Sequence, residues 1–233
     1  MRKIVMTLLA LLFLFQAFGQ KKNIARCWLW KPKAGQEQNF ENGYNKHFMW
    51  HKKNGDNPIW YCWQFVSGRR FGQFLDVSFN SWEDFDVSFK ADEDNKDYQL
   101  HIIPFAVLQN SFKLALVQGL SSSDSVGLHS KYIRLITMTV SDMANALKVI
   151  AKLKADYSAN FSIKNFFTYE MIDGGNINQI VLMLGFNSYS DFGKTENLQE
   201  DLNAIENSSK TKIITSITSE TLAYRPDLFS ISQ

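Results

Sequence analysis

The chain has 233 residues with nearly balanced charge, 25 Lys and Arg against 23 Asp and Glu, a length that suffices for one large or two small domains. Its aromatic content of 14% and its lack of low-complexity runs exclude a disordered chain. No stretch is dense in Lys and Arg, so the sequence lacks the electrostatic footprint of a protein that binds nucleic acid or an anionic membrane.

The first residues have the three-part pattern of a secretory signal peptide. Arg2 and Lys3 precede an apolar run from Ile4 to Phe15, and Ala17-Phe18-Gly19 places small residues where a signal peptidase reads them. The run is shorter than the roughly 20 apolar residues of a membrane-spanning helix. We therefore expect residues 1–19 to be a signal peptide and the rest to be exported, to the periplasm or beyond the cell, without a membrane span. Loss of Arg2 and Lys3 leaves a formal charge of zero.

The first half of the remaining chain, residues 20–120, predicts a β-α-β-β-α-β order. Alternating apolar residues predict strands, a helical apolar arc predicts the first helix, and Gly- and Pro-containing turns separate them. The predicted elements are a strand from Ala25 to Lys31, a helix from Gln36 to about Lys53, strands Ile59 to Val66 and Phe71 to Phe79, a helical region from Ser81 to about Gln109, and a strand from Phe112 to Gln118.

The second half, residues 131–233, repeats this order after a serine-rich linker at 121–130. Ser121 to Ser125 is the only stretch of that composition and predicts a flexible connector. The expected elements are a strand Tyr132 to Thr139, a helix from Ser141 to about Ser158, strands Asn165 to Ile172 and Gln179 to Phe186, a helical region from Ser188 to about Thr215, and a last strand near Ser219 to Tyr224.

An internal repeat supports this division. Phe79-Asn80-Ser81-Trp82-Glu83-Asp84-Phe85 returns as Phe186-Asn187-Ser188-Tyr189-Ser190-Asp191-Phe192, 107 positions later. Such a register indicates a duplicated supersecondary unit. We expect an α+β protein of two tandem ferredoxin-like modules, each with its helices on one face of an antiparallel sheet. The two bare faces should cover one another and form an α/β barrel.

The two cysteines, Cys27 and Cys62, would enter an oxidising compartment after export. In a ferredoxin-like sheet, their strands are separated by a third strand, about 10 Å apart. That exceeds the roughly 7 Å that a disulfide can span. We therefore expect two buried free thiols.

The tandem β-α-β-β-α-β plan, the Phe-Asn-Ser-aromatic-x-Asp-Phe motif and the ending Tyr224-Arg225-Pro226-Asp227-Leu228 resemble secreted bacterial members of the dimeric α/β-barrel superfamily. That superfamily includes antibiotic-biosynthesis-type and haem-degrading monooxygenases, chlorite-dismutase-like haem proteins and NIPSNAP-like proteins. The resemblance implies the fold and says little of the reaction. Chlorite-dismutase-like haem binding would use a histidine in the second half, where no histidine follows His129.

The first predicted helix carries two histidines four residues apart, His47 and His51, which share one face. They are either core-edge histidines with local hydrogen bonds, or His47 faces a pocket as acid, base or ligand contact. A zinc site needs a third ligand, and no Cys or His supplies an evident one, so we predict no metal. Haem-degrading relatives use an Asn, Trp and His set, of which Trp63 and His47 could supply two members.

The faces of the strands provide further candidates. Leu75, Val77 and Phe79 form a wholly apolar face that suits the helices, which would leave Asp76 facing between the sheets. Tyr61 and Trp63, with Thr168 and Glu170, form a mixed face that suits the same interior. The first strand contributes either Trp28 and Trp30 or Cys27 and Leu29, which alternation leaves open.

Two functions follow from these residues. The first is an exported protein that binds a small, mostly apolar or aromatic molecule through Trp28, Trp30, Tyr61, Trp63, Asp76 and Glu170. In the competing interpretation, the aromatic residues fill a dry core between the sheets. The second is a cofactor-independent monooxygenase or haem-degrading-type enzyme with His47, Asp76 and Trp63 as catalytic residues, Asp76 being the best base. No cofactor is predicted, and a homo-oligomer is compatible with the sequence.

Overall fold

The computed structural model describes residues 23–56, 59–122, 126–161, 163, 165–210 and 212–229. The predicted signal peptide at 1–19 lies outside these residues and stays a prediction. Within the described part of the chain, no helix is both long enough and apolar enough to cross a membrane.

Both halves have the predicted β-α-β-β-α-β order. The first half consists of β1 (Ile24–Pro32), α2 (Glu37–Lys53), β2 (Trp60–Phe65), β3 (Phe74–Asn80), a 3-10 turn (Glu83–Phe85), α3 (Ala91–His101) and β4 (Ala106–Leu116). The second consists of β5 (Tyr132–Val140), α4 (Met143–Phe161), β6 (Phe166–Asp173), β7 (Gln179–Phe186), α5 (Tyr189–Gly193), α6 (Leu198–Ser208) and β8 (Ile214–Tyr224). Short 3-10 segments lie at Gln118–Leu120, Val126–His129 and Pro226–Phe229.

The last strand of each half begins earlier than predicted. β4 starts at Ala106 rather than Phe112, and β8 starts at Ile214 rather than Ser219. Most side chains in these early portions are exposed, so they lack the alternation of apolar residues that marks a strand. Backbone pairing with β1 and β5 holds them in the sheet.

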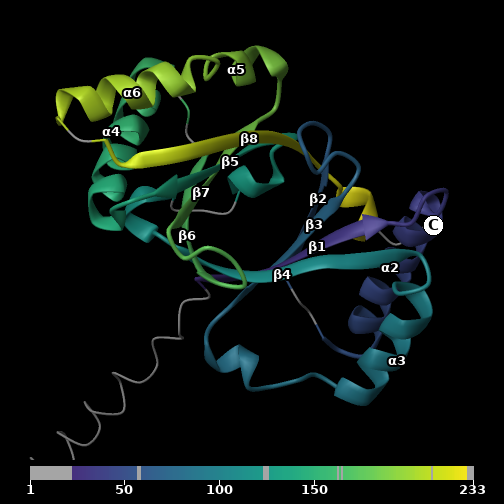
Figure 1. Cartoon of the computed structure of the whole chain (residues 1–233). Helices are drawn as coiled ribbons and strands as arrows, with labels where there is room; N and C mark the ends of the chain where they lie inside the picture. Colours follow the sequence, from purple (N-terminus) through teal and green to yellow (C-terminus); the bar gives the residue numbers. More distant parts are fainter. Residues whose placement is uncertain are drawn as a thin grey trace, which may run out of the picture.

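All eight strands form one closed antiparallel barrel in the order β1-β3-β2-β8-β5-β7-β6-β4. β4 pairs with β6 and β2 pairs with β8, so two strand pairings join the halves edge to edge. The α2 and α3 helices cover the first half of the barrel, and α4, α5 and α6 cover the second (Figure 1). The predicted α+β fold with antiparallel sheets enclosing a shared interior is thereby confirmed.

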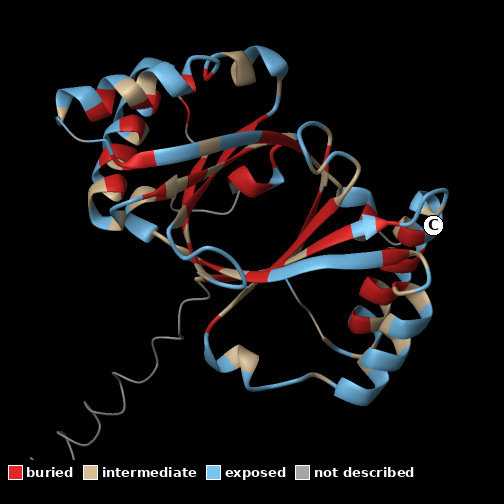
Figure 2. Cartoon of the chain, viewed as in Figure 1, coloured by how far each residue is buried: buried red, intermediate tan, exposed pale blue. Residues whose placement is uncertain are grey.

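Three apolar clusters stabilise this arrangement, one inside the barrel and one under each group of helices. Figure 2 shows buried residues along the strands of the barrel and on the helix faces turned toward the sheet. Cys27 lies in the barrel interior and Cys62 lies under α2, and both are free and buried as predicted.

The repeated motif makes a local serine–aspartate hydrogen bond at the start of a short helical segment in each half. The Ser188 hydroxyl accepts a hydrogen bond from the Asp191 N–H at 3.1 Å and donates one to its carboxylate at 2.9 Å. In the first half, the Ser81 N–H donates to the Asp84 carboxylate at 2.8 Å. Both copies thus join the serine to the aspartate three residues later, but only Ser188 caps its helix through its side chain.

The described ends of the predicted linker are packed, contrary to a flexible connector. The buried Ser121 hydroxyl donates to the Val117 carbonyl at 2.8 Å and accepts from the Thr168 N–H at 3.0 Å. Leu128 is 3% exposed and belongs to the core inside the barrel. Leu128 therefore fills part of the barrel interior.

Candidate ligand-binding cavity

The barrel encloses a cavity of about 680 Å³. Strands from both halves supply its wall, because alternate residues of every strand point inward. The apolar lining comes from Ala25, Cys27, Leu29, Trp63, Leu75, Val77, Phe79, Phe112, Leu114, Leu135, Tyr169, Met171, Val181 and Met183. Polar side chains, including those of Arg70, Asn110, Thr137, Gln179, Thr218, Ser219 and Glu220, line the remainder.

The indole of Trp63 provides a polar handle in this apolar wall. Trp63 is fully buried and lines the cavity, and its Nε1–H has no hydrogen-bond partner. The ring stacks on Tyr61 with centroids 5.6 Å apart and planes 6° apart, which fixes its orientation. An unpaired buried donor is costly, so a ligand acceptor placed there would gain a hydrogen bond with little competition from water.

An ion pair lies where the β2–β3 hairpin meets the cavity. Arg70 Nε donates to Glu220 Oε2 at 2.8 Å, and the Arg70 backbone N–H donates to Glu220 Oε1 at 2.9 Å. The guanidinium lies 4.3 Å from the Phe65 ring centroid. Gly68 has φ +86°, and a Cβ there would come within 2.4 Å of Glu220 Cγ, so glycine permits the close approach.

Two further ionisable groups of the cavity wall, the Cys27 thiol and the Tyr169 phenol, are held neutral. Burial, with the Asp76 charge adding to it, raises the pKa of the Cys27 thiol. Burial, together with Cys27 and Tyr61, raises the pKa of the Tyr169 hydroxyl. Neither group can then remove a proton from a bound molecule near neutral pH.

The structure divides the predicted ligand-binding residues between two faces of the sheet. Tyr61 and Trp63 belong to the core inside the barrel, as expected. Trp28 and Trp30 pack under α2 and α3, so Cys27 and Leu29 are the inward residues of β1. Glu170 lies between the inward-facing Tyr169 and Met171, so alternation turns it outward.

Asp76 is also on the outer face, which corrects its expected placement between the sheets. Its neighbours Leu75 and Val77 line the cavity, while Asp76 lies beneath α2 beside Tyr44. The expectation was wrong because it assigned the wholly apolar face to the helices. The barrel interior is a second apolar environment that competes with the helix interface, and here it takes the more apolar face of β3.

Burial raises the pKa of Asp76 to about 7, although Tyr44, the Val77 N–H, Arg26 and His51 all favour its charged form. The unfolded carboxyl titrates near 3.8. Between these two values the folded protein binds the proton that the unfolded chain has released. Stability should therefore fall as pH rises from about 4 to 7.

Asp76→Asn should remove this pH dependence. The difference between the pKa of Asp76 in the folded and unfolded protein corresponds to a change in the free energy of unfolding on the order of 4 kcal/mol between the two pKa values. Urea unfolding at pH 5 and pH 8 measures it, and the wild type should lose more stability than the variant between the two. Equal losses would show that Asp76 does not titrate there.

The predicted catalytic set does not converge. His47 lies on α2 and its Nδ1 is 2.8 Å from Asp97 Oδ2 on α3. Trp63 lies inside the barrel and Asp76 beneath α2 on the outer face. Sequence reasoning missed Arg70 and Glu220, which are 150 positions apart and meet only through the closure of the barrel.

Neither protein-family profiles nor curated protein sequences match the chain. Solved structures do resemble it. A protein designated a candidate monooxygenase from Lactobacillus acidophilus NCFM has a TM-score of 0.57 and 11% identity, covering 88% of this chain and 94% of its own. An anthrone oxidase-like protein has a TM-score of 0.58 and 9% identity, with 88% and 92% covered. A candidate chlorite dismutase has a TM-score of 0.58 and 11% identity, covering 89% of this chain and 96% of its own.

These likenesses show the fold. The chain is built as a closed α+β barrel, with both ferredoxin-like halves in one polypeptide, and this is the fold that it shares with these structures. At this identity the chemistry does not follow from the fold.

A haem held by histidine does not fit this cavity. Within the described chain no histidine lines it, and its thiol and phenol groups, Cys27 and Tyr169, are held protonated by burial.

Proposed function

We propose that this protein binds a flat, mostly apolar small molecule inside the barrel, with a carbonyl or similar acceptor directed at Trp63 Nε1. The observation that supports this proposal is an apolar cavity of about 680 Å³ whose wall contains a fully buried indole N–H, that of Trp63, without a hydrogen-bond partner. This volume falls in the range of small-molecule sites, roughly 300–1,000 Å³. The Arg70–Glu220 pair supplies a polar group near one side.

Trp63→Phe should weaken binding of a flat ketone, for which the naphthyl ketone dye Prodan is a suitable probe. Loss of one hydrogen bond of about 1 kcal/mol raises the dissociation constant roughly fivefold. Fluorescence titration measures this, and Trp28→Phe, on the outer face, should bind as the wild type does. Absence of saturable binding by the wild type, or equal affinity in Trp63→Phe, would contradict the proposal.

The alternative function is a cofactor-independent monooxygenase, which the structural likeness to a candidate monooxygenase and an anthrone oxidase-like protein favours. The cavity argues for binding without turnover, because the thiol and phenol in its wall stay protonated. Oxygen uptake with an anthrone as substrate distinguishes the two. We expect no uptake above the uncatalysed rate, and unchanged Prodan binding in His47→Ala and Asp76→Asn. Enzyme-dependent uptake would establish the monooxygenase instead.

We further propose that binding takes place outside the cytoplasm. The support is the sequence pattern of residues 1–19 alone. N-terminal sequencing of protein recovered from its own host should begin at Gln20. An intact Met1 would refute export by this route.

A further inference from the structure

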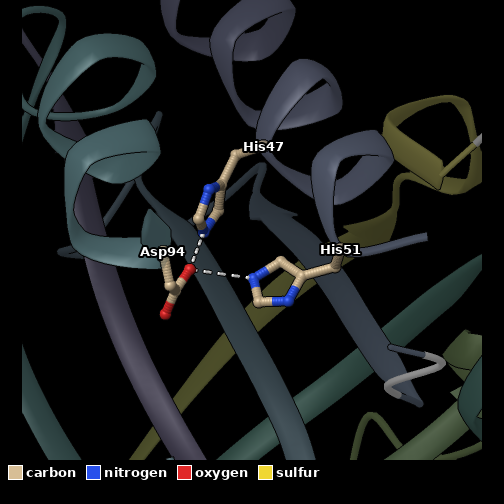
Figure 3. Close-up of side chains that lie close together, drawn as sticks. All are labelled: His47, His51 and Asp94. Atoms are coloured by element: carbon tan, nitrogen blue, oxygen red, sulfur yellow. Dashed lines mark ion pairs between the residues drawn. The ribbon is translucent and has the colours of Figure 1, made fainter. Parts of the chain in front are cut away.

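Two histidines and an aspartate converge outside the barrel, away from the cavity. His47 and His51 lie one turn apart on α2, so both rings project toward α3. Figure 3 shows both rings directed at one carboxylate oxygen of Asp94, in the first turn of α3. His51 Nε2 is 3.1 Å and His47 Nε2 is 3.7 Å from Asp94 Oδ1.

We propose that His47 Nε2, His51 Nε2 and Asp94 bind one divalent first-row transition metal ion, of which Zn²⁺ is the representative. The three ligand atoms all lie within 4.8 Å of one another. Bonds of about 2.0–2.2 Å to nitrogen and oxygen place the ligands of a tetrahedral ion roughly 3.3 Å apart. The two separations from Asp94 Oδ1, 3.1 Å to His51 Nε2 and 3.7 Å to His47 Nε2, are close to that value.

Two further carboxylates, those of Asp97 and Asp56, orient both rings for this role. His47 Nδ1 is 2.8 Å from Asp97 Oδ2, and His51 Nδ1 is 2.9 Å from Asp56 Oδ2. Each contact requires a proton on Nδ1, which directs the lone pair of the neutral ring's Nε2 toward Asp94. Metal-binding histidines are commonly held by such a carboxylate on the remote nitrogen.

With Nδ1 protonated on both rings, three acceptors face one another. Asp94 Oδ1 is buried and has no well-formed hydrogen bond, although His51 Nε2 is 3.1 Å away. Such an arrangement is repulsive unless a cation or a proton lies between the acceptors. The carboxylates of Asp56, Asp94 and Asp97 around two neutral imidazoles also make the site favourable for a cation.

The environment favours a metal that accepts nitrogen ligands. Trp60 packs on both imidazoles, with centroids 4.8 Å from His51 and 6.1 Å from His47. The side chain of His47 is 11% exposed and that of His51 is 7% exposed, whereas that of Asp94 is 37% exposed. An ion could therefore enter beside Asp94. Two imidazoles and one carboxylate suit Zn²⁺, Co²⁺ or Ni²⁺ rather than Mg²⁺ or Ca²⁺.

A proton is the competitor for this position. Burial lowers the pKa of His51, but the carboxylates of Asp94 and Asp56 outweigh burial and leave the pKa above its ordinary value. Burial, opposed by Asp97, lowers the pKa of His47 and keeps that ring neutral. An ion must therefore displace at most the His51 proton.

The test uses untagged full-length mature protein stripped with a chelator, then titrated with Zn²⁺ calorimetrically at pH 8, and with Co²⁺ by visible absorption. We expect one Zn²⁺ per chain and a Co²⁺ ligand-field spectrum. His51→Gln and Asp94→Asn should each weaken Zn²⁺ binding at least about tenfold. The matched control is His129→Gln, an exposed histidine outside the cluster, which should bind as the wild type does.

Circular dichroism of each variant shows whether it has folded, and His47→Gln is a third ligand variant if one has not. Wild-type protein that binds no Zn²⁺ stoichiometrically would overturn the proposal in favour of a proton shared by His51 and Asp94. Zn²⁺ binding that survives in all folded ligand variants would overturn it too. The cavity is not involved, so Prodan binding should be unaffected by these variants.

Discussion

Gly43→Ala is expected to be the most destabilising small substitution in the first half, lowering the free energy of unfolding by roughly 3 kcal/mol. Gly43 lies on the face of α2 that contacts the end of α3. A Cβ built there would lie 1.8 Å from the His101 carbonyl oxygen and 2.9 Å from its carbonyl carbon. These are backbone atoms, so the helices must separate to accommodate the methyl group.

The control for this substitution is Gly193→Ala, also in a helix. A Cβ at Gly193 meets nothing within 4 Å, and alanine has the higher helix propensity. We expect Gly193→Ala to change stability by less than about 1 kcal/mol, in the stabilising direction. Urea unfolding followed by circular dichroism measures both variants. Equal stabilities of Gly43→Ala and the wild type would mean that α2 and α3 are not held this closely.

Glu206→Ala is expected to have a comparable effect on the second half. Glu206 is 1% exposed, and its Oε1 accepts hydrogen bonds from the backbone N–H groups of Ile213 and Ile214 at 2.7 and 2.8 Å. These residues lead the chain into β8. Alanine would leave both donors without an acceptor, at a cost of roughly 3 kcal/mol.

Glu206→Gln separates the hydrogen bonds from the charge. The amide retains an oxygen that can accept from both N–H groups, so its loss should stay under about 1 kcal/mol. Chemical denaturation of the two variants side by side measures the difference. If glutamine were as destabilising as alanine, the charge and not the pair of backbone hydrogen bonds would be responsible.

The candidate sites show where sequence reasoning succeeded. The mixed aromatic face of Tyr61 and Trp63 was correctly expected to face the interior, because alternation within one strand is a local property. The same alternation did not decide which face of β3 turns inward. Assigning the wholly apolar face to the helices placed Asp76 in the barrel, whereas the structure places Leu75 and Val77 there.

The proposed metal site was not predicted from the sequence, for a different reason. His47 and His51 were recognised as sharing a helix face, but only Cys and His were considered as further ligands. Asp94 comes from α3, and only the packing of α3 against α2 brings its carboxylate to the histidines. An acidic first turn in α3 was the available signal, and by itself it resembles a solvated surface.

The sequence by itself determined the duplicated β-α-β-β-α-β plan and the fold, because turn chemistry and short-range periodicity act between near neighbours. Only the tertiary structure decided the faces of the strands. The shift of 107 positions between the repeated motifs would pair Tyr61 and Trp63 with Thr168 and Glu170. In the barrel, the inward residues of β6 are instead Phe167 and Tyr169, one position earlier. Because side chains alternate with a period of two, that single residue reverses every face. Closure of the barrel then determined which set of side chains surrounds the cavity.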